Sequence, residues 1–241
     1  MRKSISICIA TFNGERFIVE QINSIISALE IVKDCEWEII VSDDQSTDRT
    51  VDEILSLGYE GRLKIVRGYG KGIGKNFENA IKHSTGEYIY FADQDDVWDD
   101  KRICATIGQL DKYDFVVCEA EVVDQNLRRI LSLSLTTFKY GALSNFRKNT
   151  LTGALLCGRR GAIQKLLPFP GGVVLHDQWI AVLAPFYGFK FCFVKHKLVY
   201  YRRHGSNAST TGEARMALVK IIENRLSLAL HLFKKMLIRS G

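Results

Sequence analysis

The sequence predicts an α/β domain built on a mostly parallel central sheet with helices on both faces. Its 241 residues are 46% hydrophobic, enough to bury a core. Residues 4–92 alternate β-branched apolar runs with helical stripes. Strands that alternate with helices need right-handed crossovers, which give a parallel sheet. Because eighteen consecutive apolar residues occur nowhere, no helix is predicted to span a bilayer.

The first half of the chain carries this alternation most clearly. Apolar strands are predicted at residues 4–11, 37–41, 63–66 and 88–92. Helices are predicted between them at residues 15–29, from about 51 to 55, and at 76–83. In the first helix the apolar positions 18, 22, 25, 26 and 29 fall on one face, which we expect to be buried.

The second half is more mixed. Short strands are predicted at residues 115–118, 152–157, 190–194 and 198–202, with one helix around 179–187. We therefore expect one domain over residues 1–212, with halves at 1–113 and 114–212 that share a sheet. Residues 213–238 read as a separate amphipathic helix, whose apolar stripe is Val219, Ile222, Leu226, Ala229, Phe233 and Leu237.

Charge and cysteine usage exclude several protein classes. Nine of the basic and two of the acidic residues lie in residues 196–241, while the rest of the chain is nearly neutral. No nucleic-acid-binding motif is present, and no nucleic-acid partner is predicted. The six cysteines lie too far apart for C-x-x-C redox or zinc motifs. The start of the chain lacks a signal-peptide core, so we expect a cytoplasmic protein.

Three predicted strands end in polar segments: residues 11–13, 43–44 and 93–96. In an open parallel sheet, ligands bind beyond the carboxyl ends of the strands. A single Asp-rich strand end is commonly a solvated turn or a helix cap. Three on one rim favour a ligand site instead. The sequence Asp-Gln-Asp-Asp at residues 93–96 suits Mg²⁺ or Mn²⁺, which takes one or two carboxylates and further oxygens from water and phosphate.

The glycine-rich stretch at residues 68–75 does not fit the known phosphate-binding loops. A Walker loop would need glycine at Tyr69 and Ser or Thr at Asn76, and a dinucleotide fingerprint would need glycine at Lys75. NTPases, kinases and NAD enzymes are therefore disfavoured, while Lys71 and Lys75 remain candidate cations for a phosphate.

Five segments, in order along the chain, resemble the family 2 glycosyltransferases. They are IATFNGE (9–15), EIIVSDDQSTD (38–48), GEYIYFADQDDVW (86–98), LHDQWI (175–180) and YRRHGSN (201–207). These are inverting enzymes with a GT-A-type fold, and the chain looks most like bacterial rhamnosyl- or galactosyltransferases of surface polysaccharide assembly. The resemblance implies that residues 1–113 bind a nucleotide sugar and residues 114–212 bind the acceptor.

The resemblance also implies roles for individual residues. Asp44 matches the carboxylate that accepts the pyrimidine N3–H, which does not distinguish UDP from dTDP. Asp93 matches a residue near the ribose, and Asp95 matches the ligand of Mn²⁺ or Mg²⁺ on the diphosphate. His204 matches a position that binds the metal or the diphosphate. The expected donor-binding residues are Thr11, Phe12, Asn13, Glu15, Asp43, Asp44, Lys75, Asn76, Asp93, Arg202 and His204.

Asp177 stands where the family carries its catalytic base. An inverting displacement needs a carboxylate to take the proton of the acceptor hydroxyl. In the family, the residue before this aspartate is usually acidic, but here it is His176. Asp177 therefore has no adjacent negative charge that would raise its pKa. The alternative to a catalytic role is that Asp177 caps a helix over residues 178–187. Trp179 either stacks on an acceptor sugar or belongs to the core.

The predicted function is inverting transfer of a sugar from a UDP- or dTDP-sugar, dTDP-rhamnose among them. The expected acceptor is a hydroxyl of a glycan or lipid-linked oligosaccharide in capsule or O-antigen synthesis. The alternative is a non-catalytic scaffold that binds sugar nucleotides. The basic terminal helix either packs its apolar stripe on the domain or lies as a peripheral element on an anionic membrane at the inner face of the plasma membrane.

Overall fold

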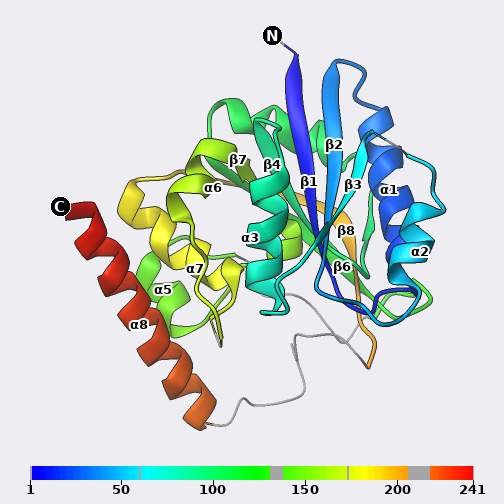
Figure 1. Ribbon diagram of the computed structural model, residues 1–241. Helices are drawn as coiled ribbons and strands as arrows, with labels where there is room; N and C mark the ends of the chain where they lie inside the picture. Colours follow the sequence, from blue (N-terminus) through cyan, green and yellow to red (C-terminus); the bar gives the residue numbers. More distant parts are fainter. Residues whose placement is uncertain (1, 60, 131–137, 173, 206–217, 241) are drawn as a thin grey trace.

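The protein folds around one mixed eight-stranded sheet (Figure 1). The computed structural model describes residues 2–59, 61–130, 138–172, 174–205 and 218–240. The strand order is β3-β2-β1-β4-β7-β6-β8-β5. The bounds are β1 Lys3–Thr11, β2 Cys35–Asp43, β3 Leu63–Arg67, β4 Tyr88–Asp93, β5 Val97–Trp98, β6 Phe115–Val123, β7 Leu156–Arg159 and β8 Phe191–Arg202. Strands β1 to β4 run parallel, as the sequence predicts.

Helices cover the sheet. Their bounds are α1 Ile18–Glu30, α2 Thr50–Leu55, α3 Ile73–His83, α4 Arg102–Ile107, α5 Ala142–Arg147, α6 Arg160–Leu166, α7 His176–Leu183 and α8 Leu218–Ser240. In Figure 1, α3, α6 and α7 lie in front of the sheet, and α3 packs on β1 and β2. Helix α1 contacts α2, α4 and β5. Helix α8 lies along the outside of the molecule, next to α5.

The core of the first half follows directly from its sequence pattern. Residues 5–11 of β1 are all buried, as expected of a central parallel strand covered on both faces. The apolar stripe predicted for the first helix is buried in α1 at every position: Ile18, Ile22, Ile25, Ile26 and Leu29. This apolar face fixes α1 against the sheet and places the polar strand ends on one rim.

Strand β7 joins the two halves of the sheet. It runs antiparallel to β4 on one side and to β6 on the other. Strand β8 then pairs in parallel with β6 along its whole length. The sequence predicts two short strands here, but β8 is one strand, because a register shift at Glu119 of β6 absorbs the polar stretch 195–197 between the two apolar runs.

The terminal helix turns most of its predicted apolar stripe away from the domain. Of the two alternatives that the sequence leaves open, packing of this stripe on the domain is not observed, because Ile222, Leu226, Phe233 and Leu237 are exposed. The side that packs on the domain instead holds Asn224 and Leu228. The predicted start of this helix and the boundary at residue 212 lie outside the described residues. Within the part of the chain that the structure describes, no helix is long and apolar enough to cross a membrane.

Candidate active site

The three polar strand ends meet on one rim of the sheet. In the register of the sheet, Thr11 of β1 is paired with Asp43 of β2, and Ala10 of β1 with Asp93 of β4. The segments 11–13, 43–44 and 93–96 therefore lie side by side, as the sequence predicts. This is the edge at which a parallel sheet of this kind binds ligands.

Gln94 locks the loop that follows β1. Its side-chain Oε1 accepts hydrogen bonds from the Thr11 hydroxyl at 2.6 Å and the Phe12 N–H at 2.8 Å, and its Nε2 donates to the Phe12 carbonyl at 3.1 Å. The Phe12 side chain is left 55% exposed at the rim. Sequence reasoning gave Gln94 no role, and its place between two aspartates was the only signal.

Asn13 and Glu15 brace the neighbouring loop. The Thr47 N–H donates to Asn13 Oδ1 at 2.8 Å, and the Arg49 N–H donates to Glu15 Oε2 at 2.9 Å. Asn13 adopts a positive φ of 48°, a conformation that asparagine tolerates better than most residues. One oxygen of each side chain thus links the loops after β1 and β2.

The two aspartates at the end of β2 have different environments. Asp43 is buried, and its carboxylate accepts hydrogen bonds from the Ser46 hydroxyl and N–H at 2.5 and 3.0 Å. Asp44 is half-buried, and its two oxygens accept the N–H groups of Gly70 and Gly72 at 2.7 and 3.1 Å. A carboxylate oxygen has a second lone pair, so Asp44 retains acceptor capacity. This geometry favours Asp44 for base recognition and a supporting role for Asp43.

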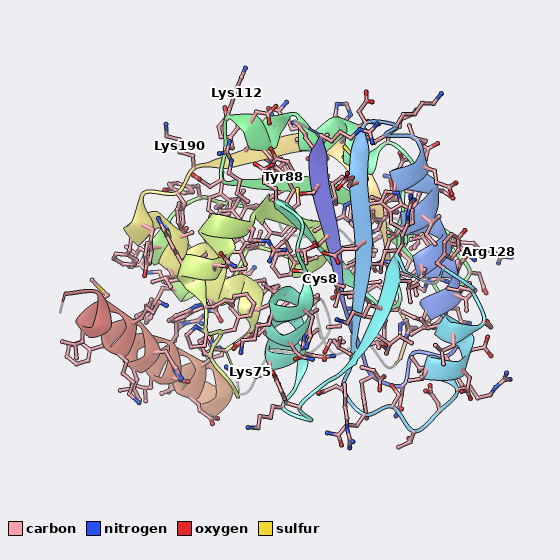
Figure 2. The ribbon with its side chains drawn as sticks, turned by 45° about the horizontal axis from the view of Figure 1, so that its top comes forward. Cys8, Lys75, Tyr88, Lys112, Arg128 and Lys190 are labelled. Atoms are coloured by element: carbon pink, nitrogen blue, oxygen red, sulfur yellow. The ribbon has the colours of Figure 1, made fainter. Side chains whose placement is uncertain are left out.

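The glycine-rich stretch leads into α3, which begins before the predicted position. Lys75 lies in its first turn (Figure 2), and its ammonium pairs with Glu78 at 2.9 Å. Asn76 is 2% exposed and donates to the Thr11 carbonyl at 3.1 Å. This contact ties the first turn of α3 to the end of β1, and direct contact of Asn76 with the donor stays a prediction.

The carboxylates after β4 lie in a poorly solvated cluster. Burial, together with the nearby charges of Asp95 and Asp177, raises the pKa of Asp93 to about 7. Burial also raises the pKa of Asp96, which is 1% exposed and accepts the Arg202 N–H at 3.0 Å. Because the charge of Asp177 contributes to the raised pKa of Asp93, the predicted catalytic base lies near the carboxylates predicted to bind the ribose and the metal.

Arg102 is a buried cation behind this cluster. Its guanidinium stacks on the Trp98 ring, 3.7 Å from the centroid, and donates to the Ala154 carbonyl at 2.6 Å. Its charge opposes the rise in the pKa of Asp93 and of Asp96. Nothing in the sequence pattern singled out this arginine, because the helix that carries it was not predicted.

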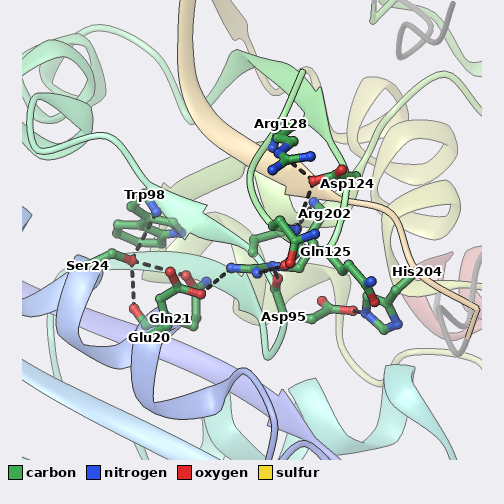
Figure 3. Close-up of polar contacts among 12 residues, drawn as sticks. Glu20, Gln21, Ser24, Asp95, Trp98, Asp124, Gln125, Arg128, Arg202 and His204 are labelled. Carbon is green, nitrogen blue, oxygen red and sulfur yellow. Dashed lines mark hydrogen bonds and ion pairs between the residues drawn. The ribbon is translucent and has the colours of Figure 1, made fainter. Parts of the chain in front are cut away.

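Asp95 and His204 converge in space although 109 positions separate them. Asp95 Oδ2 and His204 Nε2 are 2.8 Å apart (Figure 3), and the His204 ring packs on Phe17 with centroids 4.7 Å apart. No cluster of three or more His, Cys, Asp or Glu side chains that could hold a metal occurs among the described residues. One carboxylate and one imidazole still fit Mg²⁺ or Mn²⁺, which takes its other ligands from water and phosphate.

Arg202 is buried and binds other parts of the protein. It is 2% exposed, and its guanidinium donates to the carbonyls of Asp95 and Gln125, each at 2.7 Å (Figure 3). It also forms an ion pair with Glu20. This geometry disfavours the predicted contact with the diphosphate and favours a role in positioning the loop that carries Asp95.

Asp177 lies in the first turn of α7, close enough to Asp93 for its charge to raise the pKa of that residue. It is 8% exposed, and burial raises the pKa of its carboxyl to about 6, although hydrogen bonds from the Gln178 and Gly153 N–H groups and from Asn149 favour the charged form. The raised pKa comes from burial rather than from the adjacent residue in the sequence. Helix α7 has Leu175 at its N-cap, so Asp177 is not the N-cap residue, although its carboxylate accepts the Gln178 N–H of the first turn at 2.6 Å.

The neighbours of Asp177 are core residues. Trp179 is 2% exposed and its indole N–H donates to the Leu166 carbonyl at 2.8 Å, so it does not stack on a sugar. His176 is buried between the rings of Phe77 and Phe91, and burial lowers its pKa to about 3. A neutral His176 therefore places no charge beside Asp177.

Comparison with known proteins agrees with this architecture. The family model described as "Glycosyl transferase family 2" matches residues 6–167. The dTDP-rhamnosyl transferase RfbG of Shigella flexneri is 43% identical over 96 residues, which cover 37% of this chain and 32% of that protein. The Escherichia coli protein named UDP-Glc:alpha-D-GlcNAc-diphosphoundecaprenol beta-1,3-glucosyltransferase WfgD is 28% identical over 201 residues, 82% of this chain and 67% of that one. The chain thus spans between a third and two thirds of these relatives.

Solved structures share the fold. Staphylococcus aureus TarS in complex with UDP-GlcNAc has a TM-score of 0.70 at 19% identity, covering 94% of this chain and 66% of that one. Glucosyl-3-phosphoglycerate synthase from Mycobacterium tuberculosis, solved with Mn²⁺, UDP and glucosyl-3-phosphoglycerate, has a TM-score of 0.60 at 16% identity, covering 98% of this chain and 80% of that one. The predicted GT-A-type fold is confirmed. Since the family model covers well over half of the sequence, the chain belongs to glycosyl transferase family 2.

Proposed function

We propose that the protein is an inverting, metal-dependent glycosyltransferase that moves a sugar from a UDP- or dTDP-sugar to a hydroxyl of a glycan or lipid-linked oligosaccharide. The observation that carries this proposal is the position of Asp177, a buried carboxyl with a raised pKa in the same site as Asp93 and Asp95. Such a group accepts a proton near neutral pH.

The residues at the rim bind different parts of the donor. The loops after β1 and β2, with the exposed Phe12 and the half-buried Asp44 at the rim, bind the nucleotide base. Asp93 lies where the ribose is expected, and Asp95 and His204 would hold Mn²⁺ or Mg²⁺ against the diphosphate. When bound, the metal supplies positive charge that stabilises the departing nucleotide diphosphate. A buried carboxyl with a raised pKa beside further carboxylates is typical of a catalytic site, which favours an enzyme over a non-catalytic scaffold.

The chemistry is a single displacement. The Asp177 carboxylate takes the proton of the acceptor hydroxyl, and the acceptor oxygen bonds to the anomeric carbon. The bond from that carbon to the diphosphate oxygen breaks, and the nucleoside diphosphate leaves with the electron pair. Attack from the face opposite the leaving group inverts the anomeric configuration. Asp177 lies on α7, whereas Asp95 and His204 lie in the segments that follow β4 and β8, so base and leaving group are held by different parts of the chain.

Two names among the relatives support a role in bacterial polysaccharide synthesis. RfbG is named a dTDP-rhamnosyl transferase, and the name of WfgD includes a diphosphoundecaprenol acceptor. We infer by analogy a surface polysaccharide such as capsule or O-antigen, with dTDP-rhamnose as one candidate donor. These assignments rest on the relatives and not on the geometry of the site.

The test is a donor screen that measures nucleotide release from UDP- and dTDP-sugars with Mn²⁺ or Mg²⁺ present. We expect release with at least one donor and its loss when the metal is chelated. The matched control is Asp177→Asn, which keeps the nucleotide and metal residues. If no nucleotide sugar binds or turns over, or if chelation has no effect, the proposed function is wrong.

A further inference from the structure

Helix α8 is attached to the domain through its polar side. Asn224 Nδ2 donates to Gln178 Oε1 at 3.1 Å, the His231 ring packs edge-on against Trp179, and the Lys235 ammonium donates to the Leu167 carbonyl. Leu228 is the fully buried apolar residue of this side. The contacts reach α7 directly after Asp177.

The opposite side of α8 is apolar and exposed. We call it the outer face of α8 and define it by six residues that are 46% to 66% exposed: Ile222, Leu226, Leu230, Phe233, Met236 and Leu237. Their spacing of three or four positions places them on one stripe of the helix. Figure 2 shows side chains extending from α8 away from the domain. A contiguous apolar stripe of this kind on a soluble surface marks an interaction site.

The positive charge of α8 favours an anionic partner. Between Leu218 and Ser240 the sequence has five basic residues and one acidic residue. Arg225, which borders the outer face, donates to the Arg147 carbonyl and so brings the basic end of α5 alongside. Pairing two copies of α8 would bring two strongly positive helices together. An anionic bilayer accepts both the apolar stripe and the positive charge.

We propose that the outer face of α8 binds the surface of an anionic phospholipid bilayer. The apolar side chains enter the boundary between headgroups and acyl chains, and the exposed Lys234 beside Phe233 contacts lipid phosphates. Since the inner side of α8 contacts Gln178, bound lipid would lie close to the helix that carries Asp177. This last consequence rests on the proposed function, whereas binding to lipid does not.

The experiment is flotation of the full chain with vesicles, without donor or acceptor. The vesicles are phosphatidylcholine alone, or phosphatidylcholine mixed with phosphatidylglycerol. We expect binding to the mixed vesicles, about tenfold or more weaker binding to phosphatidylcholine alone, and weaker binding at high salt. Leu226→Ser combined with Phe233→Ser is expected to reduce the partition coefficient at least about tenfold. Both side chains are over 60% exposed, so the fold is expected to persist, which circular dichroism checks.

The matched control is Leu55→Ser, because Leu55 is 64% exposed on α2 and lies outside the outer face. This variant is expected to bind vesicles as the wild type does. Three results would overturn the proposal: no binding of the wild type to the mixed vesicles, an equal loss in the control, or a wild-type dimer that the double variant converts to a monomer while lipid binding stays unchanged. A failed donor screen with normal vesicle binding would overturn the proposed function alone.

Discussion

Replacing Asp177 by Asn separates the chemistry of the site from its stability. The variant keeps one side-chain oxygen to accept the Gln178 N–H, now 2.6 Å away, but it cannot take a proton. Transfer is therefore expected to fall by about 10²–10⁴, the usual contribution of a general base. Nucleotide binding is expected to stay near normal, because the nucleotide contacts lie on other strand ends. Isothermal titration calorimetry and transfer assays on one preparation measure both quantities.

The same variant is expected to be more stable than the wild type at neutral pH. Burial raises the pKa of Asp177 from 3.8 to about 6, which destabilises the folded state by about 3 kcal/mol when the carboxyl is ionised. The amide lacks one acceptor of the carboxylate, so we expect a gain of about 1–3 kcal/mol.

The sign of the pH dependence is fixed by the raised pKa. Below pH 4 the carboxyl is protonated in both the folded and the unfolded state, so its burial causes no destabilisation. The destabilisation grows as the pH rises and is complete above the pKa of the folded state. The stability difference between variant and wild type should therefore be about 1.4 kcal/mol larger at pH 8 than at pH 5. Urea unfolding at the two pH values measures it. A difference independent of pH, or a variant that transfers at the wild-type rate, would refute this account of Asp177.

Three further predictions follow from the site. Wild-type transfer should rise with pH and level off above about 6, with the rate at pH 5 about tenfold below the plateau, as a pH–rate profile would show. Asp95→Ala should abolish turnover and the effect of Mn²⁺ on nucleotide binding; a variant that titrates Mn²⁺ normally by calorimetry would move the metal elsewhere. Asp44→Ala should weaken UDP or dTDP binding by roughly 1.5–3 kcal/mol, the value of a charged hydrogen bond, and equal affinities would place the base pocket at other residues.

The part of the fold that the sequence predicts best is the part where periodicity and burial coincide. The apolar positions of α1 and the runs of β1 and β4 are buried as expected, and their spacing alone places the polar strand ends on one rim. The second half was less predictable, because β7 is short and runs antiparallel between β4 and β6. Such a pairing is set by tertiary contacts that no local pattern encodes.

The candidate site, like the fold, could be predicted only in part from the sequence. A motif indicates which residues lie at the rim, but it does not show whether a side chain faces the ligand or the protein. Asp43 and Arg202 belong to matching motifs and Asn76 follows the glycine-rich stretch, and all three are buried and hydrogen-bonded within the protein. The raised pKa of Asp177 could not be predicted either, since it depends on burial by distant segments rather than on a neighbouring charge. For α8 the apolar stripe was evident, but which side would face the domain depends on polar partners such as Gln178.

The central claim is that Asp177 drives a single displacement on a nucleotide-sugar donor. The most direct measurement is the anomeric configuration of the product, read by NMR during turnover of the donor found in the screen. The account predicts a product with the anomeric configuration opposite to that of the donor, formed by the wild type and not by Asp177→Asn. A product that keeps the configuration of the donor would contradict it.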